Sequence, residues 1–239
     1  MSIKNGLRSL LNFLHLDLTK NLEYDRLTKK IMKKVIKYNS NCIDIGCHKG
    51  EMLDVILKYS PKGKHYAFEP IPYLYENLKN EYSGKAEIYS YALSNKKGES
   101  SFQLVKNAPA YSGINKRKYD ISNPQIEEIN VELIPLDNVI PDDVKIDFIK
   151  IDVEGGEFDV LKGAKNLIKK NKPVIIFEFG LGASDYYGTN PVDMFNLITN
   201  EIGLSIYTMK DFLKNKNPMT PHEFEYLYMS NKEYYFIAK

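Results

Sequence analysis

The sequence predicts an α/β fold with a doubly wound, mostly parallel sheet. From residue 41 onward, short apolar runs alternate with stretches of helical periodicity, a pattern typical of parallel strands joined by right-handed crossovers. Acidic residues and a glycine-containing turn follow several apolar runs, at the carboxyl ends of strands where such sheets bind ligands. The length of 239 residues suits one domain with a sizeable core.

Two helices are predicted before the sheet. Apolar residues recur at helical spacing in two sets: Ile3, Leu7, Leu10, Leu11 and Leu14, then Leu27, Ile31, Val35 and Ile36. Residues 1–40 contain nine Lys/Arg and three acids, and we interpret them as an N-terminal helical extension. A cover packed on the sheet is the plainest interpretation. A homodimer contact, or a surface that meets anionic substrate or membrane, is the alternative.

Residues 41–239 form the predicted main domain. Apolar runs and helical spacing indicate, in chain order, strand 42–45, helix 51–58, strand 65–68, helix 73–82, strand 86–91, strand 146–151, helix 157–169, strand 174–179 and helix 192–201. Two last strand-like runs, 205–208 and 234–237, lack a clear helix between them. This favours an antiparallel strand near the C-terminal edge.

A long interruption separates the third and fourth of these strands. It contains two strand-like pieces, 101–105 and 131–136, and a polar loop over 106–130 that we interpret as a lid or substrate loop. Its run Lys116-Arg117-Lys118 could contact the phosphates of a nucleotide-activated sugar, or could be a solvated loop. Asp185, Tyr186 and Tyr187 are candidates for acceptor contact, and residues 212–225 could fold over the same end of the sheet.

Composition excludes several classes of protein. The net charge of +2 is nearly balanced, so nucleic acid is not an expected partner. The two cysteines, Cys42 and Cys47, are too few for a disulfide scaffold or a zinc cluster. No signal peptide or membrane-spanning run is apparent, so we expect a cytoplasmic protein that is not integral to a membrane.

The turn after the first predicted strand points to a cofactor without a pyrophosphate. Gly46 permits a tight turn, and Gly50 lets helix and strand pack closely. His48 occupies the position where a dinucleotide-binding turn has its second glycine. Asp44 would repel a phosphate, but it could pair with an ammonium group.

A second acid, Glu69, follows the next predicted strand and precedes Pro70. It lies 19 residues after Gly50, about the spacing at which an acid binds the two ribose hydroxyls. The alternative is an exposed acid at a strand end. A nucleoside with a positively charged appendage and no phosphate describes S-adenosylmethionine.

Two further acids, Asp152 and Glu154, follow the buried run 146–151 and precede Gly155-Gly156. Their position at a strand end favours a ligand site. The alternative is that Asp152 caps the next helix while Glu154 faces water.

Together these pieces resemble the FkbM-type S-adenosylmethionine-dependent methyltransferases. The resemblance rests on Asp44-Ile45-Gly46 with Gly50, Phe68-Glu69-Pro70, Ala92-Leu93-Ser94, residues 147–155 with Glu157, Leu161 and Gly163-Ala164, and then Pro173 and Glu178. It implies a class I (Rossmann-like) methyltransferase fold that acts on oxygen in sugars, glycans or natural products.

The resemblance also implies site residues. Asp44, Gly46 and Gly50 would line the methionine end of the cofactor, Glu69 the ribose, and Ala92 with Leu93 the adenine. We include the adjoining Cys47 and Pro70 among the cofactor-binding candidates. Related sequences usually have Ala-Asn where this chain has Cys47-His48.

Methyl transfer to a hydroxyl needs a general base, or a divalent metal that lowers the hydroxyl pKa. Asp152 and His222 are the catalytic candidates. Asp152 and Glu178 are candidate oxygen ligands for Mg²⁺ or Mn²⁺. Glu178 could instead hold backbone amides.

The sequence therefore predicts an O-methyltransferase that uses S-adenosylmethionine. The expected acceptor is a small molecule or glycan: a nucleotide-activated sugar, or a sugar of a surface glycan such as capsule or lipopolysaccharide. The alternatives are a nicotinamide-dependent oxidoreductase and a non-catalytic binding module on the same fold.

Overall fold

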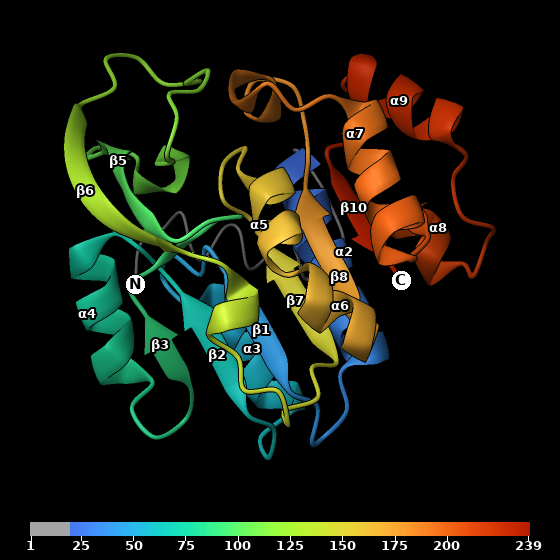
Figure 1. Cartoon of the computed structure of the whole chain (residues 1–239), viewed down its shortest axis with the longest axis horizontal. Coiled ribbons are helices and arrows are strands. Elements are labelled where there is room, and N and C mark those ends of the chain that lie inside the picture. The colour runs from blue at the N-terminus through green and yellow to red at the C-terminus, as the bar shows by residue number, and fades with distance from the viewer. Residues whose placement is uncertain (1–19) are drawn as a thin grey trace.

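The computed structural model describes residues 20–239. Within them a seven-stranded sheet lies between two layers of helices, and a three-stranded sheet lies next to it, at upper left in Figure 1. The predicted helix with Ile3, Leu7, Leu10, Leu11 and Leu14 lies outside the described residues. The expected α/β fold with a mostly parallel sheet is confirmed.

The larger sheet has one antiparallel strand. Its order is β3 (Glu87–Tyr89), β2 (His65–Phe68), β1 (Cys42–Ile45), β7 (Phe148–Ile151), β8 (Val174–Glu178), β10 (Tyr235–Ala238) and β9 (Ile206–Thr208). The pairs from β3 to β8 are parallel, whereas β10 runs antiparallel to both neighbours. The predicted antiparallel strand near the C-terminal edge is therefore present.

Strand register brings the acidic residues to one edge of this sheet. Ile45 pairs with Phe68 on one side and with Ile151 on the other, and Ile151 pairs with Phe177. The next residues along the four strands therefore meet at one carboxyl edge: Gly46, Glu69, Asp152 and Glu178.

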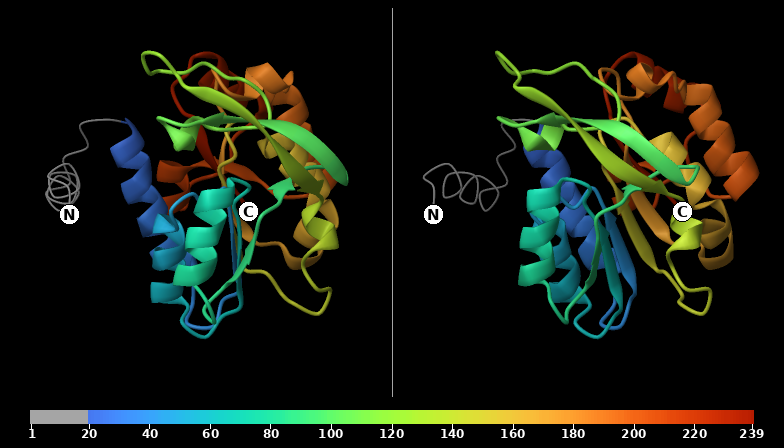
Figure 2. Two further views of the ribbon diagram at one scale, coloured as in Figure 1. Left: turned by 90° about the vertical axis from the view of Figure 1, so that its left-hand side faces the viewer. Right: turned by 60° about the vertical axis from the view of Figure 1, so that its left-hand side comes forward.

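Helices cover both faces (Figure 2). One face carries α2 (Lys20–Val35), α3 (Glu51–Tyr59), α4 (Pro72–Glu81) and α8 (Met209–Leu213). The other carries α5 (Glu157–Gly163), α6 (Lys165–Asn171), α7 (Pro191–Asn196) and α9 (Pro221–Met229). No helix of the described residues is both long and apolar enough to cross a bilayer.

Helix α2 is the described part of the N-terminal extension. Its buried face includes Leu27, Ile31 and Met32, which pack on the sheet together with α3 and α8. Tyr24 on the same face donates a hydrogen bond to Glu233 and accepts one from the backbone N–H of Tyr234. This helix is a cover on the sheet, as the plainest interpretation expected.

The three-stranded sheet was not predicted as a unit. It has the order β4 (Ala92–Leu93), β6 (Ile126–Ile134), β5 (Gly98–Val105), with β5 antiparallel to β6. The predicted strand 86–91 is shorter than expected, because the chain leaves the large sheet after β3 and enters the small one at β4. The loop between β5 and β6 contains a 3-10 turn, Pro109–Tyr111.

The predicted helix 157–169 is wrong as a single element. It is two helices, α5 and α6, that meet at Ala164. Gly163 lies so close to Ser94 that an added Cβ would stand 2.0 Å from its carbonyl oxygen. Asp137 accepts the backbone N–H groups of Asn166 and Leu167, which caps the start of α6. Further on, α7 continues into a π-helical turn, Leu197–Ile202.

Candidate functional site

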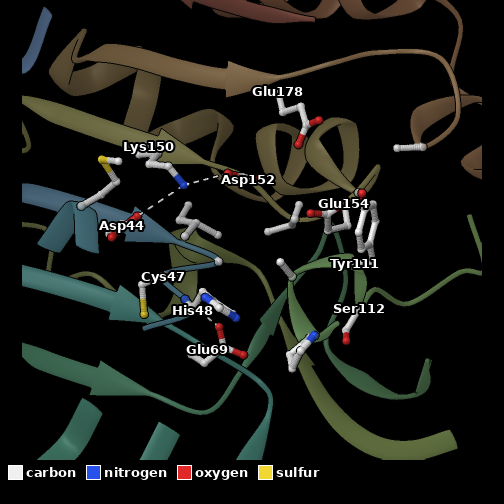
Figure 3. Close-up of a pocket in the computed structure, with 18 of the residues that line it drawn as sticks. Asp44, Cys47, His48, Glu69, Tyr111, Ser112, Lys150, Asp152, Glu154 and Glu178 are labelled. Carbon is white, nitrogen blue, oxygen red and sulfur yellow. Dashed lines mark hydrogen bonds and ion pairs between the residues drawn. The ribbon is translucent and has the colours of Figure 1, made fainter. Parts of the chain in front are cut away.

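A cavity of about 820 Å³ lies at the carboxyl edge of the parallel strands (Figure 3). Most of the predicted site residues line it: Asp44, Gly46, Cys47, Glu69, Pro70, Ala92, Leu93, Asp152 and Glu178. Gly50 and His222 do not. The loop between β5 and β6 contributes a further wall through Tyr111, Ser112 and Arg117.

The turn between β1 and α3 is shaped by left-handed backbone conformations. Gly46 has φ +73, and a Cβ added there would lie 1.9 Å from the Asp152 carbonyl oxygen. Gly50 has φ +80, and its Cβ would meet the Tyr82 hydroxyl at 2.4 Å. Gly46 thus allows β1 and β7 to approach at the cavity, whereas Gly50 serves the packing of α3 against Tyr82.

Asp44 is a buried carboxylate without a hydrogen-bond partner. Both of its oxygens are sealed from solvent and make no hydrogen bond among the described residues. Lys150, its register partner on β7, places Nζ 3.9 Å from Oδ1. Burial raises the pKa of Asp44 to about 6, with a further rise from Asp152 and an opposing effect of Lys150. Asp44 therefore has an ion-pair partner at a long distance but no hydrogen-bond donor.

Glu69 is held by two backbone amides. The N–H of His48 donates to Oε2 at 2.9 Å, and that of Ile71 donates to Oε1 at 3.0 Å. Burial outweighs these bonds and raises the pKa of Glu69 to about 7. The side chain is 4% exposed, so Glu69 is not an exposed acid at a strand end. Each oxygen keeps a second acceptor position.

Three carboxyl groups gather at the ends of β7 and β8. Oxygens of Asp152, Glu154 and Glu178 lie within 4.8 Å of one another. Asp152 Oδ2 accepts hydrogen bonds from Lys150 Nζ at 3.0 Å and from the Tyr235 hydroxyl at 2.7 Å. Although burial opposes it, these donors hold the pKa of Asp152 below its usual range. Burial and the neighbouring Asp152 charge raise the pKa of Glu178 well above its usual range.

Glu154 reaches the cavity from a strained backbone position. Its φ is +59, a region that residues other than glycine rarely occupy. Its carboxylate forms an ion pair with Arg117, and both side chains are largely buried. The Arg117 guanidinium also lies over the ring of Tyr111, 5.2 Å from its centroid. Glu154 therefore does not face water, and Arg117 is not part of a solvated loop.

His222 is not brought to the cavity. It is exposed near the start of α9, while Asp152 and Glu178 stand at the carboxyl edge. The histidine that does line the cavity is His48, whose Nε2 is buried without a partner. Burial lowers the pKa of His48, so its ring is neutral near pH 7. The position of His48 in the turn is visible in the sequence. There it indicates only that the second glycine of a dinucleotide-binding turn is absent.

Sequence reasoning also missed the role of Lys150. Lys150 and Asp152 lie two residues apart, so strand alternation places them on one face of the sheet. Figure 3 shows Lys150 between Asp44 and Asp152. The two-residue spacing of Lys150 and Asp152 could therefore have predicted their contact from the sequence. The contact of Tyr235 with Asp152, from a strand 83 residues later, had no local signal.

The sequence-family model described as the methyltransferase FkbM domain matches residues 44–203 of this chain. This chain belongs to the FkbM methyltransferase family. The crystal structure of methyltransferase FkbM from Methylobacillus flagellatus KT has a TM-score of 0.52 and 15% identity to it. The match covers 91% of this chain and 52% of that one, so this chain spans about half the length of that relative. The likeness supports a class I methyltransferase fold.

Two other solved structures have lower TM-scores. Precorrin-6y C5,15-methyltransferase from Geobacter metallireducens GS-15 has a TM-score of 0.42 and 10% identity, with 77% of this chain and 72% of that chain covered. StiE O-MT, residues 961–1257, has a TM-score of 0.44 and 8% identity, with 96% and 79% covered. No curated protein sequence matches this chain.

Membership in a methyltransferase family implies S-adenosylmethionine as the methyl donor. The cavity suits such a molecule on two counts. Asp44 offers a buried carboxylate that lacks a hydrogen-bond donor. An ammonium group of the ligand would provide that donor. The acids Asp44 and Glu69 also make this end of the cavity unfavourable for a pyrophosphate.

Proposed function

We propose that this FkbM-family protein transfers a methyl group from S-adenosylmethionine to a hydroxyl of a sugar, either nucleotide-linked or within a surface glycan. One observation carries the proposal. A single cavity contains a buried carboxylate without a hydrogen-bond donor, Asp44, and also a group of three carboxyls at the ends of β7 and β8. The first suits the ammonium group of the cofactor, and the second suits hydroxyl protons of a polyol.

The cofactor contacts follow from this division of the cavity. We assign Asp44, Gly46 and Cys47 to the methionine end of the cofactor. We assign Glu69 and Pro70 to the ribose, where each Glu69 oxygen retains an acceptor position for a hydroxyl. The adenine side is assigned to Ala92 and Leu93. In this proposal Gly50 acts indirectly, through its packing on Tyr82.

When bound, S-adenosylmethionine supplies a methyl group on an activated leaving group. The protein then needs mainly to align the acceptor hydroxyl and to take its proton. Asp152 is the proposed proton acceptor, because Lys150 and Tyr235 fix its carboxylate at the cavity wall. The loop at residues 106–125 is the proposed acceptor-binding segment, since Tyr111 and Arg117 reach the same end.

The Mg²⁺ or Mn²⁺ ion expected at Asp152 and Glu178 stays a prediction. Three carboxyls within 4.8 Å provide oxygen ligands of the required kind. However, Lys150 already neutralises Asp152, and Arg117 already neutralises Glu154. These ion pairs favour proton sharing between Asp152 and Glu178 over metal binding. Full methyl transfer in the presence of a strong chelator would exclude the metal.

Binding of S-adenosylhomocysteine tests the cofactor assignment. We expect this product to raise the melting temperature of the purified protein and Glu69→Ala to abolish the rise, because the ribose loses its acceptors. Glu76→Ala is the matched control, since Glu76 is exposed on α4 and does not line the cavity. An unchanged melting temperature in saturating S-adenosylhomocysteine would refute the proposal. A mass-spectrometric screen of sugars for a methyl-sized gain would then identify the acceptor.

The two alternatives have less support. A nicotinamide-dependent oxidoreductase would need room for a pyrophosphate at the first turn, where His48 projects instead of a second glycine. A titration with reduced nicotinamide cofactor, followed by absorbance, tests it. A non-catalytic module would bind S-adenosylhomocysteine but methylate no acceptor.

A further inference from the structure

The acceptor end of the cavity has two cationic side chains, and each is already paired. Lys150 donates to Asp152 at 3.0 Å and lies 3.9 Å from Asp44. It is buried, so it has no freedom to turn toward an incoming group. Arg117 is paired with Glu154 inside the cavity. A third described cation that lines the cavity, Lys49, is exposed and comes from the turn between β1 and α3.

The position of Arg117 is fixed by its loop. Next to it, the backbone N–H of Lys118 donates to the Gly182 carbonyl at 3.0 Å. Asn115 on the other side donates its backbone N–H to the Tyr187 hydroxyl at 3.0 Å. Stacking on Tyr111 adds a third restraint. The guanidinium is therefore held toward Glu154, and an anionic ligand would have to compete with a buried carboxylate for it.

The neighbouring lysines of this loop do not supply a free cation to the cavity in place of Arg117. Lys116 and Lys118 are both exposed, and neither lines the cavity. A phosphate or carboxylate on the acceptor ring would instead face Asp152, Glu154 and Glu178. The cations beside these acids are already paired, so they leave no free cationic donor for an added anion. Hydroxyl groups, in contrast, can donate to these same oxygens.

We infer that the acceptor end selects a neutral, hydroxyl-rich glycosyl unit, and that Glu154 sets this specificity by occupying Arg117. The inference rests on the proposed function, because it concerns the acceptor of that methyl transfer. It narrows the substrate class. A sugar ring that carries a phosphate, a nucleotide diphosphate or a carboxylate is rejected, whereas a neutral sugar within a glycan or glycoside is accepted.

Binding of inorganic phosphate to the S-adenosylhomocysteine complex tests the role of Glu154. The parent protein should show no phosphate-dependent rise in melting temperature. Glu154→Gln keeps the side-chain size and releases Arg117, so this variant should bind phosphate at least about tenfold more tightly than the parent. The double variant Glu154→Gln, Arg117→Gln should lose that gain. Phosphate binding by the parent that Arg117→Gln removes would overturn the inference.

Turnover provides a second test. S-adenosylhomocysteine release is measured with neutral methyl glycosides and with the matching hexose 1-phosphates, uronic acids and nucleotide-linked hexoses. The parent should prefer the neutral acceptor by about tenfold or more in kcat/KM. Glu154→Gln should reduce this preference, and Arg117→Gln should increase it. A purely structural ion pair would instead lower turnover of both acceptors alike in both variants, which would contradict the inference.

Different results would contradict the proposed function and the role of Glu154. If the parent does not bind S-adenosylhomocysteine, the proposed function is wrong. If it binds that ligand but prefers nucleotide-linked or phosphorylated sugars, only the inference about Glu154 and Arg117 is wrong.

Discussion

At the scale of single residues, Asp44 is a buried acid whose charge is not fully stabilised by the protein. Its carboxylate is fully buried, has no hydrogen-bond partner and lies 3.9 Å from the nearest cation, Lys150. A protein keeps such a group at the expense of its own stability. In the proposed function a cationic ligand would offset this cost, because its ammonium group would supply the missing donor.

Asp44→Asn should therefore stabilise the free protein while it weakens the cofactor complex. The folded pKa of Asp44 is raised to about 6, so ionisation disfavours the fold. The penalty is absent below pH 4, grows as pH rises and is complete above pH 6. We expect the variant to gain on the order of 2 kcal/mol over the parent at pH 8 and almost nothing at pH 4. Urea denaturation at both pH values measures this.

The same variant should lose the stabilisation by S-adenosylhomocysteine. Asp142→Asn serves as a control, because Asp142 is exposed and does not line the cavity. If Asp44→Asn is instead less stable than the parent at pH 8, attraction by Lys150 outweighs burial, and the pKa of Asp44 is not raised.

The amino-acid sequence predicted some residues of the cavity correctly and misplaced or missed others. Asp44 lies in the last half of one predicted strand and Glu69 follows another, so their place near strand ends was readable. The left-handed conformation of Glu154 was not, because φ +59 is enforced by the surrounding structure rather than by the residue. His222 was chosen for its chemistry alone, and the chain folds it onto α9, outside the cavity.

At the scale of elements, the turn between β1 and α3 forms part of the cavity wall. Gly46→Ala should destabilise the protein by more than about 3 kcal/mol, because φ +73 is strained for alanine and the Cβ would overlap the Asp152 carbonyl. It should also abolish S-adenosylhomocysteine binding. Urea denaturation and a thermal shift measurement report the two effects.

Gly84→Ala is the matched control for this turn. Gly84 has nearly the same backbone conformation, φ +71, but nothing lies within 4 Å of an added Cβ. Its substitution should cost only about 1 kcal/mol and leave ligand binding intact. Equal losses in the two variants would mean that backbone strain, and not the contact with Asp152, determines the effect at Gly46.

Elements were predictable where one local pattern dominates. The central strands are short apolar runs, and their order in the chain implies a parallel sheet. The small sheet is different: β5 and β6 mix polar and apolar residues, and their pairing depends on contacts far apart in sequence. The break between α5 and α6 likewise comes from Ser94 and Asp137, outside the helical segment.

At the scale of the whole molecule, the cavity is lined by several separate parts of the chain, helix α2 included, and three of these parts supply the acids and their partners. The parallel strands supply its acidic floor, and the loop between β5 and β6 supplies Arg117 and Tyr111. The antiparallel strand β10 supplies Tyr235. Sequence patterns locate the first part well, since strand ends are local features. The other two depend on long-range packing, so their contribution could be seen only in the folded protein.

The strand β10 has a consequence for the order in which the site is completed. It is inserted between β8 and β9, although it follows both in the chain, and its Tyr235 donates to Asp152. On the ribosome, the strands that bear Asp44, Glu69 and Asp152 emerge long before residues 235–238 are synthesised. A nascent or prematurely terminated chain that lacks these residues leaves a gap in the sheet and an incompletely restrained Asp152. The hydrogen bonding of Asp152 described above is thus complete only once β10 has entered the sheet.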